Sequence, residues 1–166
     1  MMTDLSYINR LSPEEVDIIE KFRADTPVRV GALAKALGLE VVLAALPLKI
    51  SGLIKPKDEG EGFIIKVNRF EPKQRQRFTI AHEIGHYLLH RDRIQGGVVD
   101  STLYRSKLSS RLEAEANRLA ADLLMPHDRI EEEKAKFRNL SHNQMVEKIA
   151  DILQVSKQAM GIRLGS

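Results

Sequence analysis

The chain contains neither cysteine nor tryptophan, and its aromatic residues are only five phenylalanines and three tyrosines. The absence of cysteine excludes disulfides and thiolate ligands, so any metal must be held by histidines and carboxylates. The longest apolar stretch, residues 39–54, is interrupted by Glu40, Pro47 and Lys49, and it falls short of the roughly 20 residues of a membrane helix. The first ten residues, MMTDLSYINR, do not resemble a secretion signal. We therefore expect a cytoplasmic protein without a membrane segment.

A strong excess of charge of one sign is also absent. The formal net charge of +3 comes from 26 cationic and 23 anionic residues, which is too small an excess to indicate nucleic-acid binding by itself. The length of 166 residues suits one domain. We expect a single domain over residues 1–166, with residues 140–164 packed on it as a closing segment.

Helix caps and apolar runs predict an α+β fold. Ser12 and Pro13, with Glu15 three residues after the serine, predict a helix to about Ala24. Further helices are expected over residues 30–37, 72–90, 110–125, 127–137, 141–153 and 156–164. Apolar runs at residues 39–46, 48–54 and 62–67 predict a small, mostly antiparallel three-stranded sheet. Residues 91–109 are expected to form a long loop or a short hairpin.

The predicted helix 72–90 carries an HExxH sequence, formed by His82, Glu83 and His86. Residues four apart on a helix project side by side, so the two imidazoles can bind one metal ion, with Glu83 in the same arc. Zinc suits such a site and catalytic zinc has three protein ligands; manganese is the alternative metal. Glu83 is expected to act as the general base that moves a proton from water to the leaving amine. The motif predicts a zinc-dependent peptide hydrolase that needs a third ligand.

Two nearby candidates for the third ligand are too far from the metal that His82 and His86 would bind. His90 lies two turns, about 12 Å, along the helix from His82, too far to share one metal ion with it. We expect His90 behind the ligands or along the cleft. Asp92 would need a glycine before it to turn the chain back, and Leu89 stands at that position, so the helix carries Asp92 away.

The predicted helix 110–125 offers better candidates in Glu113 and Glu115. Glu113 shares one face with Asn117, so the glutamate can bind the metal while the amide forms a hydrogen bond with the free ring nitrogen of His82. Glu115 points about 200° away from Glu113 and has a leucine four residues later. We therefore expect Glu113, and not Glu115, to be the third ligand.

A group that stabilises the transition state beside the metal is not identified by the sequence. Tyr104 and Arg105 are candidates because the long segment 91–109 could bring them over the metal, and His90 is a third. His127 and His142 are weaker candidates, since histidines at helix starts are more often surface residues.

The last segment has the outline of a helix-turn-helix, with a turn at Gln154 and Val155 between two helices. Its second helix offers only Lys157, Gln158 and Arg163 to a DNA groove. We expect this segment to pack or to dock a partner, and we do not expect it to bind DNA.

These segments together resemble the ImmA/IrrE family of metallopeptidases. The resemblance rests on RFTIAHEIGHYLLH (77–90) and EAEANRLAADLLMP (113–126), and it extends to PVRVGALAKALGLEVV (27–42) and ADILQVSKQAMGIRL (150–164). One departure is Leu119, where the family often has an aromatic residue. The resemblance implies a gluzincin-like site with His82, His86 and Glu113 as ligands of one zinc ion and Glu83 as base.

The resemblance also implies a substrate, because relatives cleave helix-turn-helix transcriptional repressors encoded on mobile elements or in stress-response loci. The leading hypothesis is thus a zinc endopeptidase acting on such a repressor. The alternatives are an interaction module that keeps the metal and binds the repressor without cutting it, and a DNA-binding regulator. The sequence does not indicate the oligomeric state.

Overall fold

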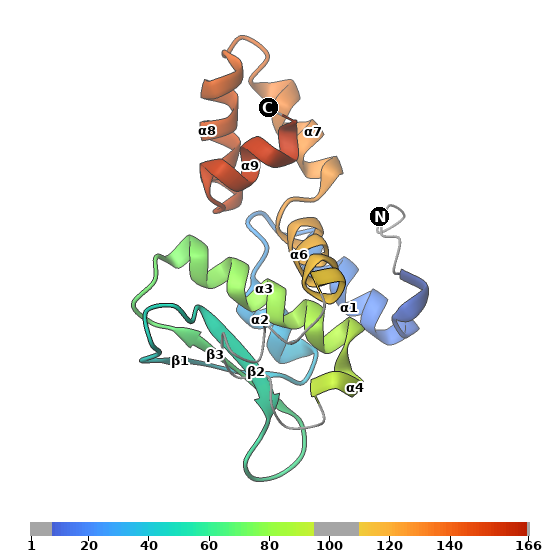
Figure 1. Ribbon diagram of the computed structural model, residues 1–166. Helices are drawn as coiled ribbons and strands as arrows, with labels where there is room; N and C mark the ends of the chain where they lie inside the picture. The colour runs from blue at the N-terminus through green and yellow to red at the C-terminus, as the bar shows by residue number, and fades with distance from the viewer. Residues whose placement is uncertain (1–7, 95–109, 166) are drawn as a thin grey trace.

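The computed structural model describes residues 8–94 and 110–165, and it has an α+β fold, as the sequence predicts (Figure 1). The strands are β1 (Glu40–Ala44), β2 (Gly52–Pro56) and β3 (Phe63–Asn68). The helices are the 3₁₀ turn η1 (Ile8–Arg10), α1 (Pro13–Arg23), α2 (Val30–Ala36), α3 (Lys73–Leu89), α4 (Arg91–Ile94), α6 (Ser110–Leu124), α7 (His127–Lys136), α8 (His142–Leu153) and α9 (Lys157–Leu164). Within these ranges, no helix combines the length and apolar character that crossing a membrane requires.

Serine caps fix the start of three helices. The Ser12 hydroxyl accepts a hydrogen bond from the Glu15 amide, and the Glu15 side chain accepts one from the Ser12 amide. The same reciprocal pair joins Ser141 and Gln144 at the start of α8, and Ser156 caps α9. Each cap satisfies amides that the first helical turn leaves without a partner.

The sheet is mixed, which corrects the expectation of a mostly antiparallel one. Its strand order is β1-β3-β2; β3 pairs antiparallel with β2 and parallel with β1. The chain reverses after β1 and forms β2 one strand's width away from it, and the connection over residues 57–62 then returns the chain as β3 into the gap between them. Because β3 therefore runs in the direction of β1, one of the two pairings is parallel.

The second strand begins later than its apolar run suggested. Leu48 is 94% exposed, and the strand runs from Gly52 to Pro56. A proline is tolerated there because β2 is at the edge of the sheet. The Asn68 side-chain amide holds the loop before β2, donating to the carbonyl oxygens of Leu46, Pro47 and Ile50. A second correction is α4, a short helix where a loop or hairpin was expected.

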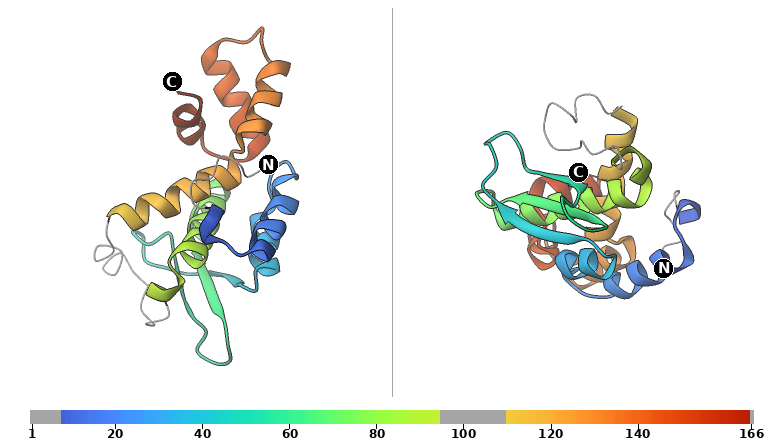
Figure 2. Two further views of the ribbon diagram at one scale, coloured as in Figure 1. Left: turned by 90° about the vertical axis from the view of Figure 1, so that its right-hand side faces the viewer. Right: turned by 90° about the horizontal axis from the view of Figure 1, so that it is seen from below.

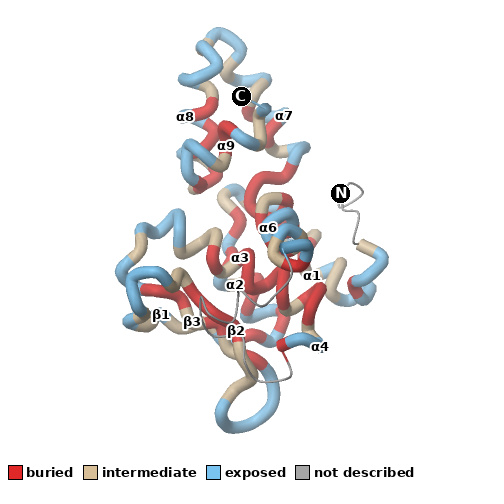
Figure 3. Tube along the Cα trace, in the orientation of Figure 1, coloured by how far each residue is buried: buried red, intermediate tan, exposed pale blue. Residues whose placement is uncertain are grey.

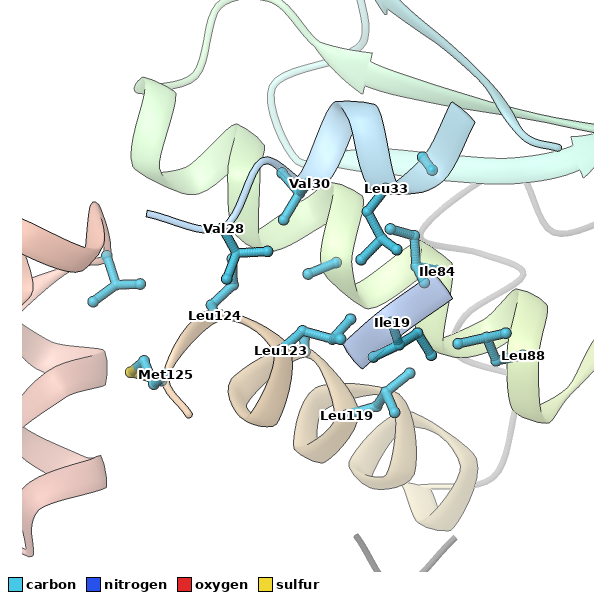
Figure 4. Packing of buried hydrophobic residues seen from close by; sticks show 14 of the residues in the cluster. Ile19, Val28, Val30, Leu33, Ile84, Leu88, Leu119, Leu123, Leu124 and Met125 are labelled. Carbon is cyan, nitrogen blue, oxygen red and sulfur yellow. The ribbon is translucent and has the colours of Figure 1, made fainter. Parts of the chain in front are cut away.

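Helix α3 is the central element of the fold. It contacts β2, β3, α2 and α6, and Figure 2 shows it between the sheet and the other helices. Its exposed first turn gives way to an uninterrupted buried stretch at residues 81–86 (Figure 3). Ile84 and Leu88 of α3 pack with Ile19 of α1 and with Leu119 and Leu123 of α6 (Figure 4). The HExxH residues thus lie on a buried stretch of a helix that packs against both the sheet and other helices.

Gly85 lets α3 and α6 approach closely. A Cβ atom at this position would lie 3.1 Å from the Cα and from the carbonyl oxygen of Ala116, and 3.3 Å from a methyl group of Leu119. Two of these contacts are with backbone, which cannot rotate away. The short distance between the two helices is what brings residues of α6 to the histidines of α3.

Helices α7, α8 and α9 form a group at one end of the molecule (Figure 1). The Arg77 guanidinium of α3 donates to the carbonyl oxygens of Val28, Leu153 and Gln154, so it ties α3 to the turn between α8 and α9. Arg163 of α9 donates to Asp122 and to the carbonyl oxygen of Met125. Two arginines therefore fix α9 relative to α3 and α6.

Candidate metal centre

His82, His86 and Glu113 converge at the contact between α3 and α6. Each offers one ligand atom, and the three atoms lie within 4.8 Å of one another. Glu113 Oε2 is 2.6 Å from His86 Nε2 and 3.4 Å from His82 Nε2. The two histidines are buried, whereas Glu113 is partly exposed, so the cluster is reached from the side of α6. Two residues on one helix and one on another thus come together, as the sequence predicts.

The other ring nitrogen of His82 faces Asn117. His82 Nδ1 lies 2.8 Å from Asn117 Oδ1, which is the contact expected from the shared helical face of Glu113 and Asn117. An amide oxygen only accepts, so Nδ1 carries the hydrogen and donates it. The Nε2 atom of His82 is then left with a lone pair, which points toward Glu113.

A longer chain of hydrogen bonds lies behind His86. Its Nδ1 is 2.9 Å from His90 Nδ1, and His90 Nε2 is 2.9 Å from Glu115 Oε1. The other oxygen of Glu115 accepts from Arg10, which also donates to the carbonyl oxygen of Leu89. Because the Glu115 carboxylate accepts from His90 Nε2, the neutral His90 ring accepts at Nδ1, and His86 Nδ1 must be the donor. Like His82, His86 keeps a lone pair at Nε2.

The surroundings also shift the pKa values of His90, Glu113 and Glu115. Burial lowers the pKa of His90, although its hydrogen bond with Glu115 acts in the opposite direction. The hydrogen bond from His90 lowers the pKa of Glu115, and Arg10 lowers it further. Burial alone would raise the pKa of Glu113, but the Nε2 hydrogen and positive charge that His82 and His86 carry when they are protonated outweigh burial and hold that pKa well below its usual range. Glu113 and Glu115 are therefore anionic near neutral pH.

The residues present fit a metal ion. Two Nε2 lone pairs and a carboxylate point into one space, and such a set of electron-rich atoms is stable only around a cation. The buried His82 Nε2 forms no hydrogen bond with the described residues. Zinc bonds of about 2.0–2.1 Å give tetrahedral edges of roughly 3.3 Å. The 3.4 Å separation of His82 and Glu113 matches such an edge, and the 2.6 Å pair would have to open by less than 1 Å.

Glu83 lies directly beside the cluster. Its side chain is fully buried, and its Oε1 atom is 4.0 Å from His82 Nε2. Burial in a low-dielectric surrounding strengthens the interactions of a carboxylate with nearby positive charge. The residue therefore stands within reach of any group held between the histidines and Glu113.

A cavity of about 520 Å³ opens onto the cluster. His82, Glu113 and Asn117 line one part of it, and the remainder is lined by side chains of α3, α6 and α9 and of the residues next to β2 and α6. Ser51, just before β2, and Phe78 of α3 belong to this lining. The cluster is thus accessible to a ligand that fills an open groove.

Several other residues singled out from the sequence lie away from the metal-facing side. His90 is buried behind His86, on the opposite side of that ring from Glu113, so its position does not suit contact with a substrate. Asp92 lies in α4 and is exposed, and His127 and His142 are exposed at the starts of α7 and α8. Tyr104 and Arg105 lie outside the described residues.

The contacts of two arginines and the role of one glutamate are not indicated by the sequence. The contact between Arg10 and Glu115 spans 105 residues, and no local pattern indicates it. Arg77 was quoted only as part of a motif. The spacing of His82, His86 and His90 does indicate a contact, because residues four apart on a helix are neighbours. Of the two positions expected for His90, behind the ligands or along the cleft, the structure has the first.

Comparisons with known proteins agree with this site. The profile of the IrrE N-terminal-like domain, a peptidase family, matches residues 34–165. The metallopeptidase ImmA of Bacillus subtilis is 30% identical over 95 residues, which are 57% of this chain and 53% of that protein. A Mycobacterium tuberculosis transcriptional regulator has a similar fold, with a TM-score of 0.61 at 16% identity, over 98% of this chain and 50% of that one.

The chain spans about half the length of these two relatives, and the structural likeness at 16% identity shows the fold alone. The family match is broader, because it covers α3, α6 and every residue of the His82, His86 and Glu113 cluster. On this evidence the chain belongs to the ImmA/IrrE family of metallopeptidases.

Proposed function

We propose that this protein is a zinc-dependent endopeptidase that cleaves a helix-turn-helix transcriptional repressor. The observation that carries the proposal is the convergence of His82 Nε2, His86 Nε2 and Glu113 Oε2 beside the buried Glu83. This is the donor set and base of a catalytic zinc site with three protein ligands. Family membership supports the same chemistry.

In this proposal His82, His86 and Glu113 hold the zinc ion, and Glu83 is the general base. A bound zinc ion would polarise the substrate carbonyl and make a water molecule easier to deprotonate. Glu83 accepts the proton from that water and donates it to the departing amine, so the carboxylate is restored at the end of the cycle. The peptide bond is hydrolysed directly, without a covalent intermediate on the protein.

Neighbouring residues orient the two histidines. Asn117 fixes the tautomer and ring plane of His82, and the chain from His90 through Glu115 to Arg10 does the same for His86. Partners of this kind make the ligand nitrogen more basic and commonly contribute 10- to 100-fold in metal affinity. Both Nε2 lone pairs are thereby aimed at the same point before metal binds.

The repressor is proposed as substrate from the family resemblance and from the similarity to ImmA. We further propose that residues 1–166 act as one cytoplasmic domain and that DNA is not a ligand of the closing segment. The ion pairs of α9 support the proposal that this segment does not bind DNA. Lys157 pairs with Glu147, and Arg163 pairs with Asp122. Few cations remain on that helix for phosphate contacts.

A cleavage assay tests the proposal. Purified protein with saturating zinc is incubated with helix-turn-helix repressors of the same organism, and the products are followed by mass spectrometry. Glu83→Gln is the matched variant: it is expected to bind one zinc ion yet to cleave roughly 10²- to 10⁴-fold more slowly, since only the base is lost. A wild-type protein that binds the repressor and zinc but leaves the repressor whole would support the non-cleaving module instead.

A further inference from the structure

Part of the lining of the cavity at the metal cluster is apolar. Besides Ala121, this part is formed by Phe78 of α3, whose ring stacks on that of His82, by Met125 after α6, and by Ala159 and Ile162 of α9. Ile162 is 75% exposed, so its side chain is open to a ligand that enters the cavity. The helix-turn-helix-like segment therefore supplies part of the cleft that leads to the cluster.

This groove continues along α9. A second cavity of about 360 Å³ shares Arg75, Phe78, Ala159 and Ile162 with the first, and it reaches Val155 and Ser156 at the start of α9. Ligand sites commonly combine an apolar lining with a few polar groups that fix orientation. The lining that the two cavities share includes the apolar side chains of Phe78, Ala159 and Ile162. Polar groups lie at the cluster and also in the second cavity, whose lining includes Gln74, Arg75, Ser156 and Gln158. Such a groove suits an extended peptide rather than a small polar molecule.

The position of α9 is fixed by polar contacts to the helices that carry the cluster. Arg77 lies one turn before His82 on α3 and holds the turn that precedes α9 through Leu153 and Gln154. From the other side, Arg163 binds Asp122 at 2.7 Å near the end of α6. Both residues of this pair are largely buried, so solvent weakens their interaction little. These contacts fix the distance between the apolar residues of α9 and the metal cluster.

We propose that α9 is the specificity wall of the active-site cleft and that Ile162, together with Phe78, binds an apolar side chain of the peptide substrate close to the scissile bond. This inference rests on the proposed peptidase function and deepens it. It gives the closing segment a role in selecting substrate, and it predicts that peptides with a large aliphatic or aromatic residue in this region bind better than peptides with a small or charged one.

Binding of linear hydroxamic acids to the zinc-loaded protein tests the wall without requiring cleavage. Acetohydroxamate and octanohydroxamate carry the same metal-binding head, but only the longer one can lie along the groove. Isothermal titration calorimetry is expected to show that octanohydroxamate binds at least about tenfold more tightly, as burial of two methylene groups would give. In Ile162→Ser the two affinities are expected to fall within about threefold of each other. Ile162→Leu is expected to keep the gain.

Leu43→Ser is the matched control, because Leu43 is an exposed aliphatic residue on β1 that does not line either cavity. It is expected to retain the full gain from the longer chain. The proposed role of α9 would be refuted if octanohydroxamate gained the same affinity over acetohydroxamate in wild type and in Ile162→Ser, or if it gained none in wild type. Either result would leave the metal site unchallenged. If neither hydroxamate bound and the protein took up no zinc, the proposed function itself would fail.

Discussion

Replacing His90 by phenylalanine is expected to weaken zinc binding, although His90 touches neither the cleft nor the ligand atoms that face it. Phenylalanine fills a similar volume but accepts no hydrogen bond. The His86 Nδ1 hydrogen, now donated over 2.9 Å to His90, would lose its acceptor in a buried place. Leaving a buried donor without a partner costs about 1–3 kcal/mol, which corresponds to a roughly 5- to 150-fold weaker zinc affinity if His86 turns away from the metal to recover a partner.

Competition with a chromophoric chelator measures this affinity, and far-ultraviolet circular dichroism checks that the variant is folded. Glu115→Gln is the graded comparison, because its amide oxygen can still accept from His90 while the negative charge is gone. It is expected to lose less affinity than His90→Phe. A folded His90→Phe protein with the zinc affinity of the wild type would refute the orienting role of the chain from His86 to Arg10.

Two further changes test the cluster and the helix contact that builds it. Glu113→Ala is expected to abolish stoichiometric zinc binding, measured by metal analysis after gel filtration, whereas Glu115→Ala is expected to retain the metal at reduced affinity; equal loss would mean that the wrong glutamate is assigned. Gly85→Ala is expected to lower the free energy of unfolding by about 1–3 kcal/mol, partly offset by up to about 1 kcal/mol of helix propensity, because its Cβ would press on the Ala116 backbone. Urea denaturation measures this change, and unaltered stability together with unaltered zinc affinity would show that α3 and α6 can separate freely.

The elements with strong local signals were predictable from the sequence. Three helix starts are predictable from serines, because each serine hydroxyl accepts a hydrogen bond from a backbone amide only a few residues away. These serines are Ser12, Ser141 and Ser156. The pairing of Glu113 with Asn117 followed from helical periodicity, and the contact of Asn117 with His82 is present in the structure. These predictions needed geometry within one helix and one assumption, that the two helices meet.

Features that depend on distant contacts were not predictable. The parallel pairing of β1 with β3 depends on which gap the hairpin fills, and the apolar runs are alike in either arrangement. Leu48 belongs to an apolar run, but the strand begins only at Gly52, after a loop that Asn68 fixes from β3. Glu115 was compared with Glu113 only as a ligand; its place beside His90 depends on how α6 rotates against α3.

The first helix has a consequence for where this domain begins. The family match starts at residue 34, yet Ile19 of α1 is fully buried among Leu119, Leu123 and other core residues. Arg10 supports Glu115, and Glu15 binds Arg91 at 2.6 Å just past the end of α3. A fragment trimmed to the matched region would expose core side chains that Ile19 covers, and it would lack Arg10, the last residue in the series of hydrogen bonds behind His86. We therefore expect a fragment that begins at the matched region to be less stable than one that retains the residues from Arg10 onward.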